Sequence, residues 1–124
     1  MNIHIKTTNI TLTDAISDYV NKRLEKLEKL TSDDPSAQCD LELGRTTAHH
    51  NKGEVFKAEI HLVGAAGLNI YTSIEKEDLY AAVDAVRDAV LNEFTASRKK
   101  HASRIRRGGA RIKDMMKGMW PWGN

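Results

Sequence analysis

The chain has 124 residues, of which 40% are hydrophobic and 29% charged, and we expect one main folded domain. No apolar run reaches the roughly 18 residues that a membrane-spanning helix needs, and the N-terminus lacks the basic start and apolar core of a signal peptide. The single cysteine, Cys39, excludes an intramolecular disulfide and suits a reducing cytoplasm, where we expect it to be a small buried residue.

The first two predicted elements are a strand and a helix. Apolar and polar residues alternate over residues 2 to 6, which is typical of a half-buried strand. Thr13 is a suitable N-cap, and Asp14 after it favours the positive end of a helix. Apolar residues then recur at spacings of three and four as far as Leu30, where the turn-rich stretch 31 to 37 predicts a loop.

Three further strands and a second helix follow. Alternation over residues 39 to 43, 56 to 62 and 68 to 74 predicts strands, and the short turn at 64 to 67 predicts an antiparallel hairpin. From Asp78 onward the period is helical again. The apolar stripe of this helix consists of Leu79, Val83, Val86, Val90 and Phe94. The fold class is therefore α+β with the order β-α-β-β-β-α. Because each strand is apolar on one face only, both helices should pack on that face of a four-stranded sheet.

Charge is divided unevenly along this chain. Residues 1 to 97 carry 10 Lys and Arg against 16 Asp and Glu, whereas residues 98 to 124 carry nine against Asp114 alone. The stretch 97 to 111, here called the basic segment, contains seven Lys and Arg and no acidic residue. Helix capping needs only one or two cations, so such a block indicates a polyanionic partner. A nucleic acid and an acidic membrane give the same charge signal, and composition alone does not separate them.

The first predicted helix adds basic residues to this signal. Lys22, Lys26 and Lys29 follow spacings of four and three on one exposed face, and Arg23 lies beside them. Interleaved Glu25 and Glu28 leave a second interpretation open, a solvated helix with ion pairs on its surface. Taken with the basic segment at the end of the second helix, the pattern favours a surface that binds nucleic acid.

Two strings carry a family resemblance. RLEKLEK at 23 to 29 and EDLYAAVDAV at 77 to 86, in this order and with this element pattern, resemble the ribosome hibernation-promoting factors, also called ribosome-associated inhibitors or ribosomal subunit interface proteins. The resemblance covers residues 1 to about 104. It implies a double-stranded-RNA-binding-like fold in a cytoplasmic bacterial protein, one that occupies the messenger and transfer RNA sites between the ribosomal subunits and silences idle ribosomes.

The resemblance also implies a partner and contact residues. The partner would be the ribosome, chiefly small-subunit rRNA. The expected RNA-binding residues, taken from the family pattern and from the basic segment, are Lys22, Arg23, Lys26, Lys29, Asp78, Tyr80, Arg98, Lys99, Lys100, Arg104, Arg106 and Arg107. The chain departs from the family at Ala89, Asn92 and Ala96, where members often carry basic residues. Its length leaves no room for the second domain through which longer members pair ribosomes.

We expect a ribosome-binding domain at 1–107 and a tail at 108–124 with at most one short helical turn. Gly108, Gly109 and Pro121 favour that boundary. Trp120 and Trp122 in this tail could stack on unpaired bases, dock on a protein or interfacial surface, or belong to a disordered end. The sequence leaves these three alternatives open.

No enzymatic motif stands out. His49 and His50 are adjacent and would point to opposite sides of an extended chain, so they suit metal chelation poorly. His4 and His61 fall on polar strand faces, which leaves open a cross-strand contact between them. We expect no catalytic residue, metal, cofactor or small-molecule substrate, and no membrane partner. The alternative function is a general RNA-binding or membrane-surface module that acts through the basic segment alone, and it would not depend on the first helix.

Overall fold

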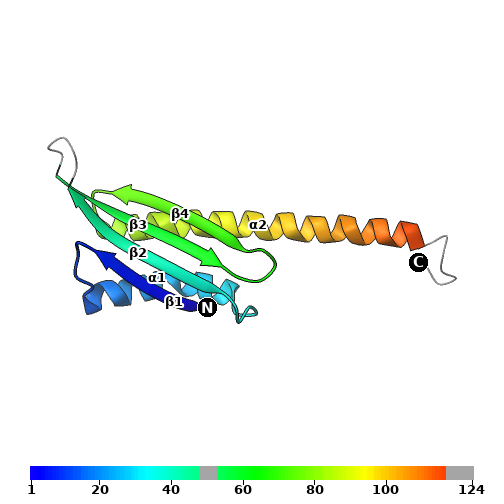
Figure 1. Ribbon diagram of the computed structural model, residues 1–124, viewed down its shortest axis with the longest axis horizontal. Helices are drawn as coiled ribbons and strands as arrows, with labels where there is room; N and C mark the ends of the chain where they lie inside the picture. Colours follow the sequence, from blue (N-terminus) through cyan, green and yellow to red (C-terminus); the bar gives the residue numbers. More distant parts are fainter. Residues whose placement is uncertain (48–52, 117–124) are drawn as a thin grey trace. The chain divides into compact units, whose positions relative to one another are not determined.

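Six elements follow one another in the order that the periodicity predicted, which confirms the α+β fold class (Figure 1). The computed structural model describes residues 1–47 and 53–116, and the chain divides into two compact units, residues 1–93 and 94–124. The elements are β1 (Asn2–Thr8), α1 (Asp14–Leu30), β2 (Gln38–Thr47), β3 (Glu54–Val63), β4 (Asn69–Lys76) and α2 (Leu79–Met116).

The four strands form one mixed sheet in the order β1-β2-β3-β4. β1 pairs parallel with β2, and α1 supplies the crossover that a parallel pair requires. The other two pairings are antiparallel. Alternate residues of the strands point to one face and are buried there, and they include Cys39, Leu41, Leu43, Ala58, Ile60, Leu62 and Ile70.

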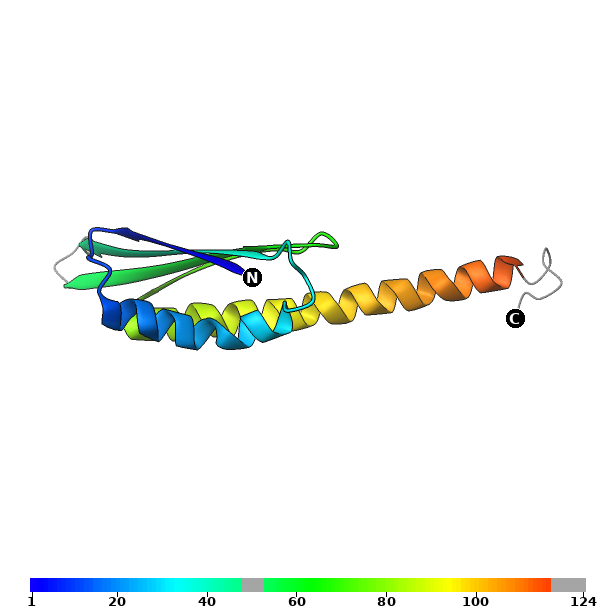
Figure 2. The same ribbon diagram turned by 90° about the horizontal axis from the view of Figure 1, so that it is seen from below.

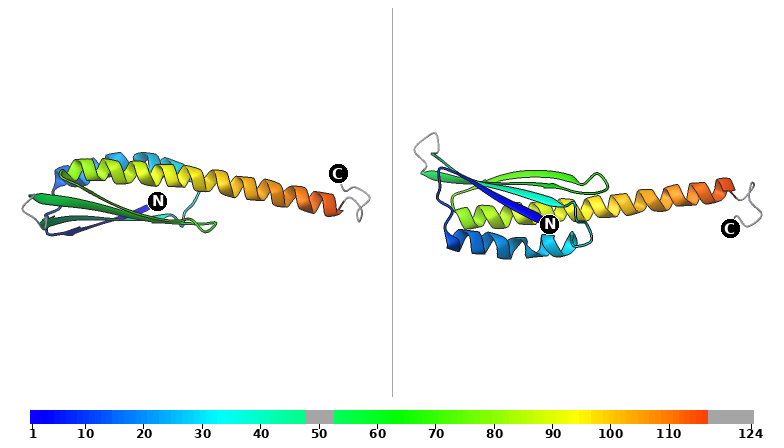
Figure 3. Two further views of the ribbon diagram at one scale, coloured as in Figure 1. Left: turned by 90° about the horizontal axis from the view of Figure 1, so that it is seen from above. Right: turned by 60° about the horizontal axis from the view of Figure 1, so that its bottom comes forward.

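α1 and the part of α2 within the first unit lie on this apolar face of the sheet, as expected from the one-sided strands (Figure 2). Within the first unit, α1 and the beginning of α2 run side by side (Figure 3). Val20, Leu24 and Leu27 of α1 are fully buried, and each such side chain contributes about 1.5–3 kcal/mol of hydrophobic free energy. The packing therefore fixes which side of α1 remains exposed.

Caps define both ends of α1. The Thr13 hydroxyl accepts a hydrogen bond of 3.2 Å from the Ile16 amide, so the predicted N-cap is confirmed. At the other end, the buried Thr31 hydroxyl donates to the Leu27 carbonyl at 2.8 Å. These bonds satisfy groups that the helix ends would otherwise leave unpaired.

The second helix is longer than the sequence suggested. Its predicted stripe from Leu79 to Phe94 is buried, but the helix continues through Gly108 and Gly109 to Met116. The expectation of at most one short helical turn beyond residue 107 was therefore wrong. A glycine costs only about 1 kcal/mol relative to alanine inside a helix, and good helix formers flank this pair. The division into domain 1–107 and tail 108–124 stays a prediction.

Five residues, 64 to 68, connect β3 to β4 and contain a two-residue turn. The Leu68 amide donates to the Ala65 carbonyl at 3.2 Å, and the two residues between them, Ala66 and Gly67, have φ of 59° and 77°. Positive φ at both central positions is what the preferred hairpin turns require. The Asp34 carboxylate accepts a 2.8 Å bond from the Ala65 amide, which ties the loop after α1 to this turn.

Candidate nucleic-acid interface

The exposed side of α1 carries the predicted lysines. Lys22, Lys26 and Lys29 are all exposed, opposite the buried Val20 and Leu24. Helical periodicity alone sets this arrangement, since residues three and four apart share a face. The three lysines are here called the α1 lysine face, and their ammonium groups are available to contact phosphates.

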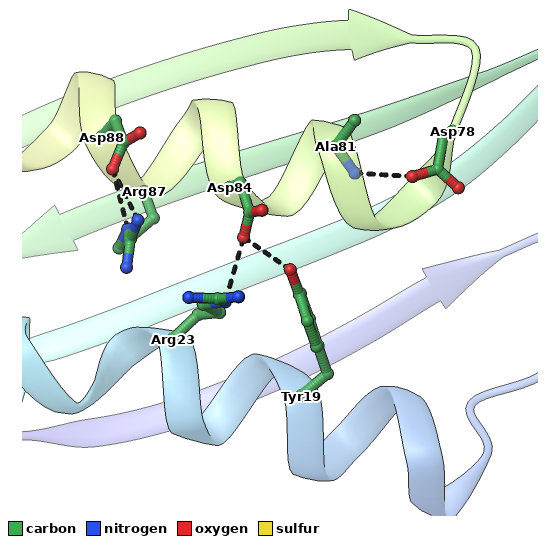
Figure 4. Close-up of polar contacts among 7 residues, drawn as sticks. All are labelled: Tyr19, Arg23, Asp78, Ala81, Asp84, Arg87 and Asp88. Atoms are coloured by element: carbon green, nitrogen blue, oxygen red, sulfur yellow. Dashed lines mark hydrogen bonds and ion pairs between the residues drawn. The ribbon is translucent and has the colours of Figure 1, made fainter.

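Arg23 differs from these lysines because it is held against α2. Its Nε atom lies 3.2 Å from Oδ1 of Asp84, and its guanidinium carbon lies 4.9 Å from the centre of the Tyr19 ring (Figure 4). A hydrogen bond with Tyr19 and the negative charge of Asp84 raise the pKa of Arg23 above its ordinary value. The side chain is still 42% exposed, so Arg23 is ordered without being removed from the surface.

Tyr19 and Tyr80 complete this contact between the helices. The Tyr19 hydroxyl donates a 2.8 Å bond to the same Oδ1 atom of Asp84. The rings of Tyr19 and Tyr80 meet edge to face, with centres 4.7 Å apart and planes at 79°. Tyr80 keeps 38% of its surface exposed. We call Tyr19, Arg23 and Tyr80 the aromatic platform; Asp84 of α2 contacts Tyr19 and Arg23, and Tyr80 contacts the Tyr19 ring.

Asp78 has a different role from its neighbour Tyr80. Its Oδ2 atom accepts a hydrogen bond of 3.0 Å from the Ala81 amide (Figure 4). Its carbonyl accepts another of 3.0 Å from the Ala82 amide. These contacts cap the N-terminus of α2. A carboxylate in this position also favours the positive end of the helix dipole. Asp78 therefore shapes the surface by fixing where α2 begins.

The remaining predicted residues lie in the second unit. Arg98, Lys99 and Lys100 are exposed on α2, and the Arg98 guanidinium carbon lies 5.2 Å from the centre of the Phe94 ring. Three more, Arg104, Arg106 and Arg107, lie within α2, but their side chains are outside the described ones. His49, His50, Trp120 and Trp122 also lie outside the described residues.

Positive charge is not spread evenly over these helices. α1 carries four basic and four acidic residues, and residues 79 to 93 of α2 carry Arg87 against Asp84, Asp88 and Glu93. Arg87 is paired with Asp88 at 2.8 Å (Figure 4). The helices of the first unit are thus slightly acidic in sum. The basic segment at 97 to 111 holds most of the charge that could attract phosphates.

The two strand histidines line one hollow on the opposite face of the sheet, on strands that are not neighbours. β2 separates them, because His4 pairs with Asp40 and Asp40 pairs with His61, so the two histidines are not on neighbouring strands. Nε2 of His61 instead lies 2.7 Å from Oδ1 of Asn69. Among the side chains that the structure describes, no group of His, Cys, Asp and Glu is arranged to hold a metal ion.

Cys39 is buried, as expected for a small apolar residue. Burial raises the pKa of its thiol to about 12, so the thiol stays protonated and is a poor nucleophile at neutral pH. No helix in the described part of the chain is long and apolar enough to cross a membrane.

Sequence reasoning missed two members of this surface. Helical periodicity places Tyr19 on the apolar stripe of α1, which hides the use of its hydroxyl. Asp84 carries no local signal, because its role depends on an α1 residue 65 positions away. The cap at Asp78, by contrast, could have been found from an aspartate directly before a helical period.

Comparison with known proteins gives consistent matches. The family model described as "Sigma 54 modulation protein / S30EA ribosomal protein" matches residues 3–102. The chain is 27% identical over 104 residues to the ribosome hibernation promoting factor of Azotobacter vinelandii, which covers 84% of this chain and 89% of that protein. It is 26% identical over 100 residues to the factor of the same name from Klebsiella oxytoca, covering 81% and 96%.

A solved structure agrees with these sequence matches. The N-terminal domain of Thermus thermophilus Protein Y is similar with a TM-score of 0.60 and 31% sequence identity. The match covers 75% of this chain and 94% of that domain. The similarity thus includes both the order of the elements and their arrangement in space.

Proposed function

The chain belongs to the Sigma 54 modulation protein / S30EA ribosomal protein family, and we propose that it binds between the ribosomal subunits and blocks the messenger and transfer RNA sites during dormancy. The family is one of hibernation factors and not of enzymes. The observation that carries the proposal is the match to hibernation factors over nearly their whole length. Inhibition is then reversible occupancy, without a chemical step.

Electrostatics supports a division of labour within this proposal. The basic segment supplies most of the attraction to phosphates, since the helices of the first unit are slightly acidic in sum. The α1 lysine face adds contacts that depend on the position of α1. The proposed RNA-binding residues are Lys22, Arg23, Lys26, Lys29, Asp78, Tyr80, Arg98, Lys99, Lys100, Arg104, Arg106 and Arg107.

Shape supplies the selectivity in this proposal. Two helices packed on a sheet form a rigid surface, and folded RNA is recognised largely by shape and by phosphate and ribose contacts. The caps at Thr13 and Asp78 fix where each helix begins. The α1 lysine face therefore has a fixed position for contacts with rRNA, whereas the charge of the basic segment alone would attract any polyanion.

Sedimentation of the full chain with vacant bacterial ribosomes tests the proposal. We expect saturable binding of about one molecule per ribosome that weakens as salt rises. The double substitution of Lys22 and Lys26 by Glu should abolish stoichiometric binding. A matched control reverses Lys6 and Lys76, which are exposed on β1 and β4, and changes the net charge equally. Binding that is lost equally in both variants would contradict a contact through α1.

The concentration of charge in the basic segment favours one second candidate, a general RNA-binding or membrane-surface module. That module would bind in large excess over ribosomes and would keep binding after Lys22 and Lys26 are reversed. Sedimentation of the same protein with vesicles of anionic lipid distinguishes a membrane-surface module, which would bind them, from a general RNA-binding module. The proposed hibernation function predicts no binding to vesicles at physiological salt.

A further inference from the structure

The surface between α1 and α2 is poorly suited to binding phosphates. Three carboxylates of α2, on Asp84, Asp88 and Glu93, lie on the part of the helix within the first unit. Asp84 and Asp88 are paired with Arg23 and Arg87, so these two arginines are already neutralised and attract a phosphate only weakly. The same surface nevertheless exposes a tyrosine ring and a guanidinium group, Tyr80 and Arg23. These two groups suit a partner that is planar and carries little charge.

One carboxylate oxygen of α2 contacts both α1 residues of this surface, Tyr19 and Arg23 (Figure 4). Oδ1 of Asp84 accepts a hydrogen bond of 2.8 Å from the Tyr19 hydroxyl and lies 3.2 Å from Nε of Arg23. The guanidinium lies over the Tyr19 ring, and the Tyr80 ring contacts the same ring at 4.7 Å. Ordering an arginine normally costs side-chain entropy on binding. Here Asp84 has already ordered it, so a ligand meets a preformed surface.

We propose that the aromatic platform of Tyr19, Arg23 and Tyr80 stacks an unpaired base of ribosomal RNA, and that Asp84 is the residue that positions it. This inference rests on the proposed function. Unpaired bases in RNA loops stack on tyrosine rings and on arginine planes. The Asp84 carboxylate already neutralises Arg23, which weakens the attraction of this site for a phosphate. The platform thus recognises a base, while the basic segment attracts the backbone.

Base stacking and phosphate contact differ in their dependence on salt, and this difference gives a specific test. A lost phosphate contact lowers affinity and also flattens the plot of log affinity against log salt by about one unit. A lost stacking contact lowers affinity and leaves the slope unchanged. Ribosome affinity should therefore be measured at several salt concentrations for each variant.

The expected result for Tyr80→Ala is an affinity roughly 5- to 150-fold weaker, with the salt slope of the wild type. Tyr80→Phe keeps the ring and should bind like the wild type. Tyr80→Leu keeps apolar contact without an aromatic plane and should resemble Tyr80→Ala, which separates stacking from folding. Tyr71→Ala is the matched control, since Tyr71 on β4 is 59% exposed and lies on a strand.

Asp84 is tested by two substitutions and a direct readout. Asp84→Ala should weaken binding toward the level of Tyr80→Ala, whereas Asp84→Asn keeps an acceptor oxygen and should restore most of the affinity. Chemical probing of rRNA bases should show a base that is protected by the wild type and by Tyr80→Phe and reactive with Tyr80→Ala.

Three results would overturn the inference. If Tyr80→Ala binds ribosomes with wild-type affinity, the base-stacking role of the platform is refuted and the proposed ribosome binding still stands. A flatter salt slope for Tyr80→Ala would assign the site to a phosphate. Failure of the wild type itself to bind ribosomes would overturn the proposed function and the platform together.

Discussion

Removing one hydroxyl between the two helices tests how they are held together. Tyr19→Phe deletes only the phenolic oxygen, which lies 2.8 Å from Asp84. A hydrogen bond to a charged group contributes about 1.5–3 kcal/mol net. Because the Asp84 side chain is 40% exposed, water competes for it, and we expect a smaller loss of about 1 kcal/mol in the free energy of unfolding. For a chain of this size, Tm falls by roughly 4 °C.

Urea denaturation followed by circular dichroism measures this loss. The midpoint should fall while the slope stays constant, since the surface exposed on unfolding hardly changes. The same Tyr19→Phe substitution in an Asp84→Ala background should cost almost nothing, because its acceptor is already gone. An equal loss in both backgrounds, or no loss in either, would refute the role assigned to this bond.

Three further predictions concern single groups. Thr72→Val should raise the free energy of unfolding by about 1 kcal/mol in urea denaturation, because within the described residues the Thr72 Oγ1 atom is buried without a hydrogen-bond partner; a loss of stability would contradict this. Cys39 should resist alkylation in the folded protein at about pH 8 and react fully in concentrated guanidinium, since burial raises the pKa of its thiol from 9.0 to about 12. The stability linked to this thiol is complete below pH 9.0 and is lost as pH rises toward 12. Hydrogen bonds from the Ser36 hydroxyl and the Ala65 amide lower the pKa of Asp34 below 3.8, so its contribution is present above that pH and is lost as the pH falls through the lowered pKa. In acid titrations followed by circular dichroism, Asp34→Asn should therefore lose less of its stability than the wild type over this range, and an identical pH dependence would show that Asp34 makes no such contribution.

The fold could be predicted from the sequence because periodicity is local. Each strand alternates on one face, and each helix repeats its apolar stripe, so the element order and the buried faces of α1 and α2 follow directly. Strand order is not local. β2 lies between β1 and β3, and this placement separates His4 from His61, which the sequence alone left open.

The candidate site was predictable only in part for the same reason. The α1 lysine face follows from helical spacing, and its exposure is confirmed. The engagement of Arg23 with Asp84 depends on how the helices pack, and no spacing within one helix reveals it. The end of α2 was misjudged because the Gly108–Gly109 pair was given more weight than the helix formers around it.

Competition with the natural ribosome substrates tests the central proposal most directly. Vacant ribosomes would be saturated with the full chain, and the binding of labelled messenger and transfer RNA would then be measured at fixed salt. If the protein blocks both sites, it should lower the binding of both RNAs in proportion to its occupancy, and excess RNA should displace it. Unchanged RNA binding to ribosomes that still carry one protein molecule each would contradict site blocking.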